Sequence, residues 1–344
     1  MTEPLIRLKH LSKFFPVDKD LLGRTTSVLK AVDDLTLDIY PGETFGLVGE
    51  SGCGKTTVGK MMVDLYRPTS GEIWYGGQDL TKLSARERRG RCCEIQLIFQ
   101  DPYASLNPRM TVGDMISEPI RINRLLPRNQ IYDRVAYLLN AVGLSANYRN
   151  RFAHEFSGGQ RQRIGVARAL AMQPKLIVCD EPVSALDVSI QAQVLNLLSD
   201  LGDEFGLTYL FIAHGLNVVK HISDRVGVMY LGRLVEVAPK RELYNNPLHP
   251  YTKALLSAIP VTNPAQRKER ILLEGDVSSP IDPPPGCRFA SRCYARSGCV
   301  GCACETTMPE LVEVSPGHFV SCYLYVNGTL SSSPADAQGS ASPA

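Results

Sequence analysis

The chain has 344 residues, a length that suits about two domains at roughly 150 residues each. Its 37 lysines and arginines nearly balance its 35 aspartates and glutamates, so the net charge of +2 gives no electrostatic reason to expect nucleic acid as a partner. No stretch reaches the roughly 18 consecutive apolar residues of a membrane-spanning helix, and residues 1–10 lack the apolar run of a secretory signal. We therefore expect any membrane role to be peripheral, through another protein.

The first hundred residues predict a flank rich in strands. Apolar residues alternate with polar ones over 35–39, and a proline-glycine turn separates them from an apolar strand at 44–48. Further strands are expected over 71–77 and 94–99. Between the second and third strands lie a glycine-rich loop and a helix.

From about residue 110 to 172 the apolar spacing becomes helical, through 112–122, 131–142 and 164–171. This pattern predicts a mostly helical subdomain over about 101–172. Short apolar runs rich in β-branched residues then alternate with helices, at 176–179, 207–213 and 226–230. Such alternation is typical of parallel βα units, so the core sheet is expected to be largely parallel.

The chain changes character after about residue 245. A short helix over 251–259 precedes a proline-rich stretch and a segment rich in cysteine. From about 330 the residues are mostly Ser, Ala, Gly and Pro, with little to bury. We expect a first domain over 1–245, a small C-terminal appendage over 246–330 and a disordered tail over 331–344.

Residues 49–56 read GESGCGKT and fit the P-loop pattern between a predicted strand and a predicted helix. In such a loop the glycines let backbone N–H groups surround phosphates, the lysine reaches the β- and γ-phosphates, and the threonine hydroxyl ligates Mg²⁺. An ATP site is therefore expected here. Its residues are Gly49, Ser51, Gly52, Cys53, Gly54, Lys55, Thr56 and Thr57.

The strand over 176–181 ends in two carboxylates, Asp180 and Glu181. Paired with a P-loop, the first is placed to hold Mg²⁺ through water and the second to orient and deprotonate the attacking water. Alone, such a pair is usually an ordinary loop start. The P-loop upstream favours the catalytic interpretation.

Phe156 is followed by Ser157, Gly158, Gly159 and Gln160, which on their own read as a helix N-cap and a tight helix entry. A P-loop, then SGGQ, then an Asp-Glu strand end resembles the nucleotide-binding domain of ABC transporters, and the resemblance covers about 5–245. Phe156 stands where leucine is usual. The resemblance implies an α/β P-loop core of ABC type with an antiparallel β flank and a helical subdomain.

The resemblance also assigns roles to residues that are bland alone. Gln100 looks like the residue that touches Mg²⁺ beside the membrane subunit's docking surface, Asp187 like part of the loop that crosses the dimer interface, and His214 like the histidine that contacts the γ-phosphate. Phe15 is similar to the aromatic on which adenine stacks, with Phe14 as the competitor. In the family, Ser157 and Gly159 of one subunit close over the phosphate that Lys55 of the other holds.

Residues 98–110 and 246–255 narrow the resemblance to the F-type ATPase of oligopeptide and dipeptide importers. This implies a sibling ATPase, two permease subunits, an extracytoplasmic peptide-binding protein, and a location at the cytoplasmic face of the membrane. Nickel or another small solute is the alternative cargo. A soluble non-transport ABC ATPase and a non-enzymatic metal or redox module are the competing classes.

Six of the ten cysteines crowd the stretch 287–322. In a reducing compartment such a cluster indicates a metal site before disulfides. Similar importers end in a four-cysteine segment, which implies that Cys287, Cys293 and Cys322, with Cys304, hold a [4Fe–4S] cluster. Cys299 or Cys302 could replace Cys304. A tetrahedral Zn²⁺ site and free thiols are the alternatives.

Overall fold

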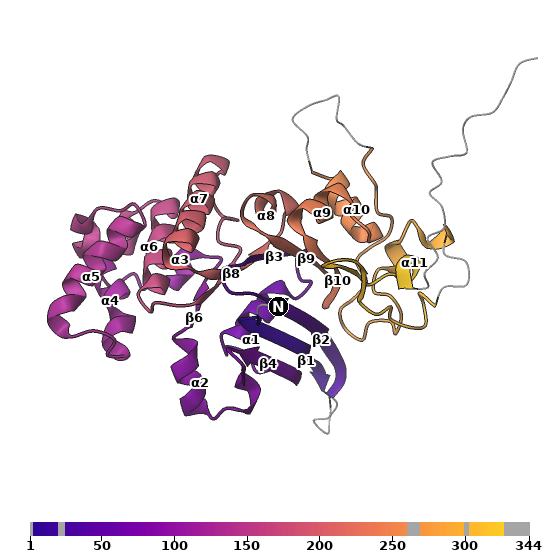
Figure 1. Cartoon of the computed structure of the whole chain (residues 1–344), viewed down its shortest axis with the longest axis horizontal. Coiled ribbons are helices and arrows are strands. Elements are labelled where there is room, and N and C mark those ends of the chain that lie inside the picture. Colours follow the sequence, from indigo (N-terminus) through magenta and orange to yellow (C-terminus); the bar gives the residue numbers. More distant parts are fainter. Residues whose placement is uncertain (1–2, 20–24, 260–268, 299–302, 327–344) are drawn as a thin grey trace, which may run out of the picture.

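The structure is a computed structural model that describes residues 3–19, 25–259, 269–298 and 303–326. Two sheets form the centre of the molecule, with a group of helices at one end and the C-terminal segment at the other (Figure 1). The predicted α/β fold, with its antiparallel flank and helical subdomain, is confirmed.

The smaller sheet is antiparallel and has the strand order β2-β1-β4-β5. Its strands are β1 (Ile6–Lys19), β2 (Thr25–Ile39), β4 (Ser70–Tyr75) and β5 (Gln78–Asp79). Its membership differs from the prediction, because β1 is not among the predicted strands and two predicted strands, at 44–48 and 94–99, belong to the other sheet. Register shifts along β1 explain the omission, since they break the alternation that marks a strand.

The larger sheet has the order β11-β12-β10-β9-β3-β8-β7-β6. Its parallel centre is formed by β3 (Thr44–Val48), β6 (Ile95–Ile98), β7 (Leu176–Asp180), β8 (Thr208–Ala213) and β9 (Arg225–Tyr230). Every residue of β7 and β8 is buried, as in a parallel sheet that is covered on both faces. The prediction of a largely parallel core is confirmed.

Helices cover this sheet. They are α1 (Lys55–Met62), α2 (Ala85–Cys92), α7 (Val188–Phe205) and α8 (Leu216–Ile222), with a 3-10 turn η1 (Leu80–Lys82) before α2. Helix α1 contacts β7 and β8, which places its first residue beside the ends of both strands. The carboxyl ends of the parallel strands and the start of α1 therefore meet at one edge of the sheet.

The helical subdomain lies at the left of Figure 1. Its helices are α3 (Pro102–Ser105), α4 (Val112–Ile122), α5 (Arg128–Ala141) and α6 (Gly158–Leu170), with 3-10 turns η2 (Ala146–Asn150) and η3 (Ala153–Glu155). The three predicted helices are present. Thr111 caps α4, and the buried Met115, Ile116 and Ile120 recur at helical spacing along it.

The C-terminal segment is continuous with the larger sheet. Its elements are β10 (Arg233–Pro239), α9 (Lys240–Asn245), α10 (Pro250–Ser257), η5 (Ala290–Arg292), η6 (Arg296–Gly298), β11 (Val312–Ser315), β12 (His318–Val320) and α11 (Tyr323–Val326). Strand β12 pairs with β10, and the buried Glu236 carboxylate is 2.8 Å from His318 Nε2. The same carboxylate accepts backbone N–H groups of Leu248 and His249. The segment is thus joined to the core through the sheet and through this buried carboxylate.

No helix in the described ranges is long and apolar enough to cross a membrane. The predicted tail at 331–344 lies outside the described residues, as do Cys299 and Cys302.

Candidate active site

The P-loop joins β3 to α1 in a conformation that only glycine allows. Gly49 has a φ of +155°, and a Cβ there would lie 2.1 Å from the carbonyl oxygen of Met229. Gly54 has a φ of +104°, and α1 begins one residue later. The loop therefore leads directly into the start of α1, where the first N–H groups of a helix can bind an anion.

Lys55 lies at the centre of this loop and is only 3 % exposed. Its ammonium donates to the carbonyl oxygens of Gly49, at 2.8 Å, and Glu50, at 3.0 Å. Cys53 is buried beneath it, and burial raises the pKa of the Cys53 thiol. Ser51 and Gly52 are exposed at the mouth of the loop, and Thr57 follows within α1. A buried cation beside the start of a helix suits a polyphosphate.

Thr56 and Asp180 are joined at the end of β7. The Thr56 hydroxyl donates to the Asp180 carboxylate over 2.8 Å. Asp180 is buried, and burial raises the pKa of its carboxyl group, with Lys60, Lys55 and His214 acting in the opposite direction. A hydroxyl and a carboxylate in contact are the oxygen ligands that Mg²⁺ prefers, so these residues fit a magnesium ion between the loop and the strand.

Glu181 is held between two side chains from neighbouring strand ends. The Gln100 amide donates to its Oε2 over 2.7 Å, and His214 Nε2 lies 2.7 Å from its Oε1. The backbone of Glu181 is left-handed, with a φ of +48°, and its N–H donates to Ile212 of β8. Such a conformation in a residue other than glycine is strained and needs support from its surroundings. The structure thus fixes both carboxylate oxygens at the sheet edge.

Two residues at the start of α6 form a reciprocal pair of hydrogen bonds. Ser157 caps the helix by accepting from the Gln160 N–H, and the Gln160 side chain accepts from the Ser157 N–H over 3.0 Å. Gly158 and Gly159 let α6 approach α7, because a Cβ on Gly159 would lie 2.5 Å from Ile190 Cγ2. Asp187 caps α7 by accepting from the Ile190 N–H. The structure therefore leaves the exposed Ser157 at the surface, apart from the P-loop network.

Phe15 lies within β1, half-buried. Its ring meets that of Tyr66 edge to face at 5.5 Å, and the Lys13 ammonium lies 5.0 Å above it. Phe14 is likewise half-buried, with Lys30 5.7 Å from its ring. Each of the two rings has a lysine ammonium nearby, so the geometry favours neither Phe15 nor Phe14 as the residue that stacks on adenine.

Two family models match this chain. Residues 32–184 match the ABC transporter model, and residues 235–299 match the model for the C-terminal region of oligopeptide/dipeptide transporters. The oligopeptide transport ATP-binding protein AppF of Bacillus subtilis is 51 % identical over 94 % of this chain and 98 % of its own length. OppF of Salmonella typhimurium, a protein of the same description, is 53 % identical over 92 % of this chain and 95 % of its own.

The chain belongs to the ABC family of oligopeptide transport ATP-binding proteins. Its resemblance to this family is confirmed, and so is its class as an ABC-type ATPase. Among solved structures, the ATP-binding cassette MJ0796 in a dimeric state with ADP and phosphate is 26 % identical, with a TM-score of 0.61 over 69 % of this chain and 99 % of that one. The cbiO1 protein of Clostridium perfringens is 25 % identical, with a TM-score of 0.62 over 71 % of this chain and 92 % of its own.

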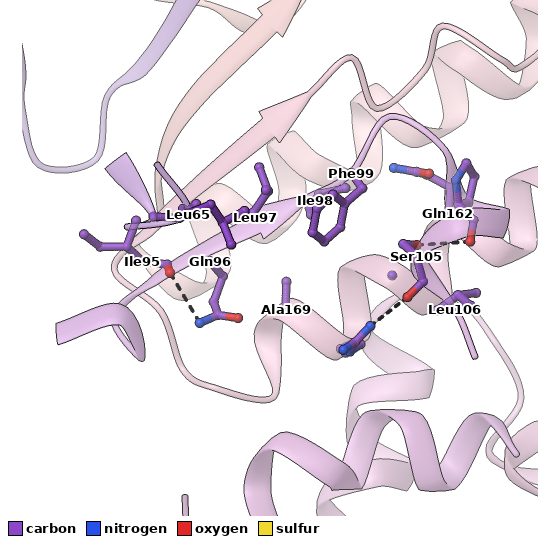
Figure 2. Close-up of a pocket in the computed structure, with 14 residues that line it drawn as sticks. Leu65, Ile95, Gln96, Leu97, Ile98, Phe99, Ser105, Leu106, Gln162 and Ala169 are labelled. Atoms are coloured by element: carbon purple, nitrogen blue, oxygen red, sulfur yellow. Dashed lines mark hydrogen bonds between the residues drawn. The ribbon is translucent and has the colours of Figure 1, made fainter. Parts of the chain in front are cut away.

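A groove lined mainly by apolar residues lies beside Gln100 in this ABC ATPase. The residues that line it are not predicted individually from the sequence. The volume of the groove is about 250 Å³. Figure 2 shows β6 along it and α6 across from β6. The Arg168 guanidinium donates to the Ser105 carbonyl over 2.8 Å. Phe99 on its wall is 42 % exposed, and Tyr103 nearby is 65 % exposed. These two exposed side chains make the groove a candidate contact surface.

Four cysteines of the C-terminal segment lie near one another. Burial raises the pKa of all four thiols, and that of Cys322 is raised further by Cys287, Cys293 and Cys304, to about 12. The Cys287 N–H donates to the Cys304 carbonyl over 2.7 Å, which ties the two ends together. Within the described ranges, no group of three or more His, Cys, Asp or Glu side chains is arranged to hold a metal ion.

Proposed function

We propose that the chain supplies ATP hydrolysis to a peptide importer, with Glu181 as the general base. The observation that carries this proposal is that Glu181 is held at 2.7 Å by both Gln100 and His214, at the same sheet edge as the P-loop. A buried carboxylate with both oxygens oriented can accept a proton from one water molecule. His214, nearly half exposed, then lies on the side from which the γ-phosphate arrives.

Lys55 exchanges its two loop carbonyls for phosphate oxygens when nucleotide enters. Thr56 and Asp180 are the Mg²⁺ ligands in this proposal, directly and through water, with Gln100 beside them. Bound there, Mg²⁺ would neutralise charge that develops on the β- and γ-phosphate oxygens. Phe15 is the stacking partner of the adenine.

The second half of each catalytic site comes from another ATPase subunit. This proposal is supported by Ser157, which is exposed and whose hydroxyl accepts from the Gln160 N–H of its own helix start. In a dimer, Ser157 and Gly159 close over the phosphates held by the partner's loop, and Asp187 lies at the interface. We propose that the partner is a sibling ATPase, as the resemblance to importer ATPases implies, with a second copy of this chain as the alternative.

The groove beside Gln100 is the docking site for the permease subunits. It joins the catalytic amide to an exposed apolar surface, so closure of the ATPase pair would move whatever is docked there. Docked in this way, the chain works at the cytoplasmic face of the membrane. The relatives' description as oligopeptide transport proteins supports peptides as the cargo, which an extracytoplasmic binding protein delivers.

Reconstitution tests this proposal. The chain, its sibling and the two permeases are assembled in vesicles, and peptide uptake is measured with and without ATP. We expect uptake that depends on ATP and on the peptide-binding protein. Phe99→Glu should detach the chain from the permeases, whereas Leu272→Glu, at a residue that is also exposed, should not. Uptake of a metal ion or sugar in place of peptide would contradict the cargo, and undiminished assembly of Phe99→Glu would contradict the docking site.

The C-terminal cysteines are proposed to hold a [4Fe–4S] cluster through Cys287, Cys293, Cys304 and Cys322. Their proximity supports this, and the thiols would have to lose protons and draw together on binding. Iron, acid-labile sulfide and zinc should be measured after anaerobic purification. We expect about four irons per chain, lost in Cys304→Ser and kept in Cys93→Ser. Stoichiometric zinc without sulfide would favour the Zn²⁺ alternative, and iron retained by Cys304→Ser would move the third ligand to Cys299 or Cys302.

A further inference from the structure

The P-loop is held from outside by the C-terminal segment, at Glu50. The Glu50 N–H donates to the Tyr251 hydroxyl over 3.0 Å, and the Glu50 carboxylate lies 3.1 Å from the Arg292 guanidinium. The carbonyl of the same residue accepts from Lys55. Glu50 therefore connects Lys55 to two side chains, Tyr251 and Arg292, that lie more than 200 positions from Glu50 in the sequence.

Both side chains are fixed by packing before they reach the loop. The rings of Tyr230, Tyr251 and Phe289 form one cluster, with centroids 4.7 to 5.4 Å apart. Tyr230 ends β9, Tyr251 belongs to α10, and Phe289 directly precedes η5, whose last residue is Arg292. Aromatic packing of this kind gives a rigid support. The cluster is nearly inaccessible to solvent, because each of the three residues is at most 1 % exposed.

The Arg292 ion pair is unlike a surface pair. The Arg292 side chain is 10 % exposed and that of Glu50 is 29 % exposed. The guanidinium uses one nitrogen for both Glu50 oxygens and for the Tyr230 hydroxyl, at 3.4 Å. A charge that is mostly buried and loses its partner is costly, so the loop is expected to keep the position that satisfies Arg292.

We propose that Arg292 and Tyr251 are positioning residues that hold the P-loop in its phosphate-binding conformation. The C-terminal segment thereby has a direct effect on nucleotide affinity, in addition to any contact with other subunits. This inference rests on the proposed role of residues 49–56 in binding the phosphates. It predicts that loss of either side chain weakens binding of ADP, whose phosphates occupy the loop without the help of a second subunit.

The test is calorimetric titration of the full-length chain with ADP and Mg²⁺, together with thermal unfolding. We expect Arg292→Gln to weaken binding about tenfold, which corresponds to about 1.4 kcal/mol, and Arg292→Lys to recover part of the loss. Tyr251→Phe, which removes only the hydroxyl, should weaken binding by a smaller factor. The control is Arg225→Gln, which breaks a 3.1 Å pair with Glu43 at the opposite edge of the same sheet and should lower the midpoint of unfolding without changing affinity.

A double-mutant cycle separates positioning from general destabilisation. In a Glu50→Gln background, Arg292→Gln should have little further effect on affinity, because the pair is already broken. An unchanged affinity in Arg292→Gln would overturn the inference, and so would an equal loss in both backgrounds. Lys55→Ala tests the proposed phosphate-binding role of residues 49–56 separately. If this variant binds ADP as tightly as the parent, the P-loop role itself is wrong.

Discussion

The carboxyl edge of the parallel sheet and the start of α6 carry the two most recognisable motifs of the chain, yet the structure treats them differently. At the sheet edge the motif residues already touch: Thr56 contacts Asp180, and Glu181 contacts Gln100 and His214. At the start of α6, the side chains of Ser157 and Gln160 form their hydrogen bonds within the helix start itself. The difference indicates which part of the catalytic site one chain can build and which part is presented to another.

The sheet edge also includes a strained backbone position. Glu181 has a left-handed backbone, supported by its N–H bond to Ile212 and by Ser184, whose N–H and hydroxyl both donate to the Glu181 carbonyl. The N-cap of α6, in contrast, has an ordinary extended backbone. Strain held in place by several hydrogen bonds is typical of a residue whose side chain must be aimed accurately.

The largest effect should come from breaking the sheet-edge network. Glu181→Gln removes the group that accepts the proton from water, so we expect ATP turnover in the assembled transporter to fall by about 10²–10⁴-fold, with nucleotide affinity retained. The measurement is phosphate release beside equilibrium binding of ATP. Glu204→Gln, the same change at the exposed partner of Tyr137, is the control and should leave both values near those of the parent. Turnover at the parent rate in Glu181→Gln would show that another group is the base.

An intermediate effect should come from the start of α6, and it should be seen on the other chain. Ser157→Ala removes the cap and the hydroxyl proposed to reach the partner's phosphate, so we expect turnover to fall about a hundredfold. Nucleotide trapping followed by photo-crosslinking in the assembled pair should show the loss on the partner's subunit, with this chain still labelled. The reverse pattern would mean that Ser157 acts within its own chain.

Loss of a helix cap alone has to be separated from this effect. Thr111→Ala removes the corresponding cap of α4 in the same helical subdomain. Each of the two substitutions should lower the free energy of unfolding by about 1 kcal/mol. Only Ser157→Ala should lower turnover, and an equal loss of turnover in Thr111→Ala would attribute the effect to the stability of the subdomain.

Much of the sheet edge is predictable because the information is local. Each strand that contributes to it is a short apolar run, and Gln100, Glu181 and His214 each follow such a run by one or two residues. In a parallel sheet those ends must meet at one edge, and they do: Asp180 pairs with Ile212 in register. The order of strands and helices therefore predicts a largely parallel sheet, whereas the roles of Gln100 and His214 come from the resemblance to ABC transporters.

The remainder depends on contacts that have no local signal. Strand β12 has three residues, too few for alternation to be recognised, and its partner Glu236 lies 82 positions from His318. The Arg292 contact with Glu50 spans 242 positions and joins two residues that are unremarkable alone. For the same reason the sequence does not predict that the C-terminal segment extends the sheet and contacts the P-loop.

The smallest effect should come from the adenine contact, on the antiparallel flank rather than on either motif. Phe15 and Phe14 are adjacent on β1, both half-buried and each near one lysine, so the comparison of the two is itself the experiment. Phe15→Ala removes a ring that also packs edge to face on Tyr66. Stacking of a base on an aromatic ring is worth about 1–3 kcal/mol, and for a ring with one open face we expect the lower part of that range, about tenfold in affinity.

Titration with ATP and with inorganic triphosphate separates the contribution of the base from that of the phosphates. Phe15→Ala should weaken the binding of ATP alone, whereas Phe14→Ala should weaken the binding of neither. If Phe14→Ala instead weakens ATP and Phe15→Ala does not, Phe14 is the stacking residue, and equal losses for ATP and triphosphate would attribute the effect to the fold of the flank.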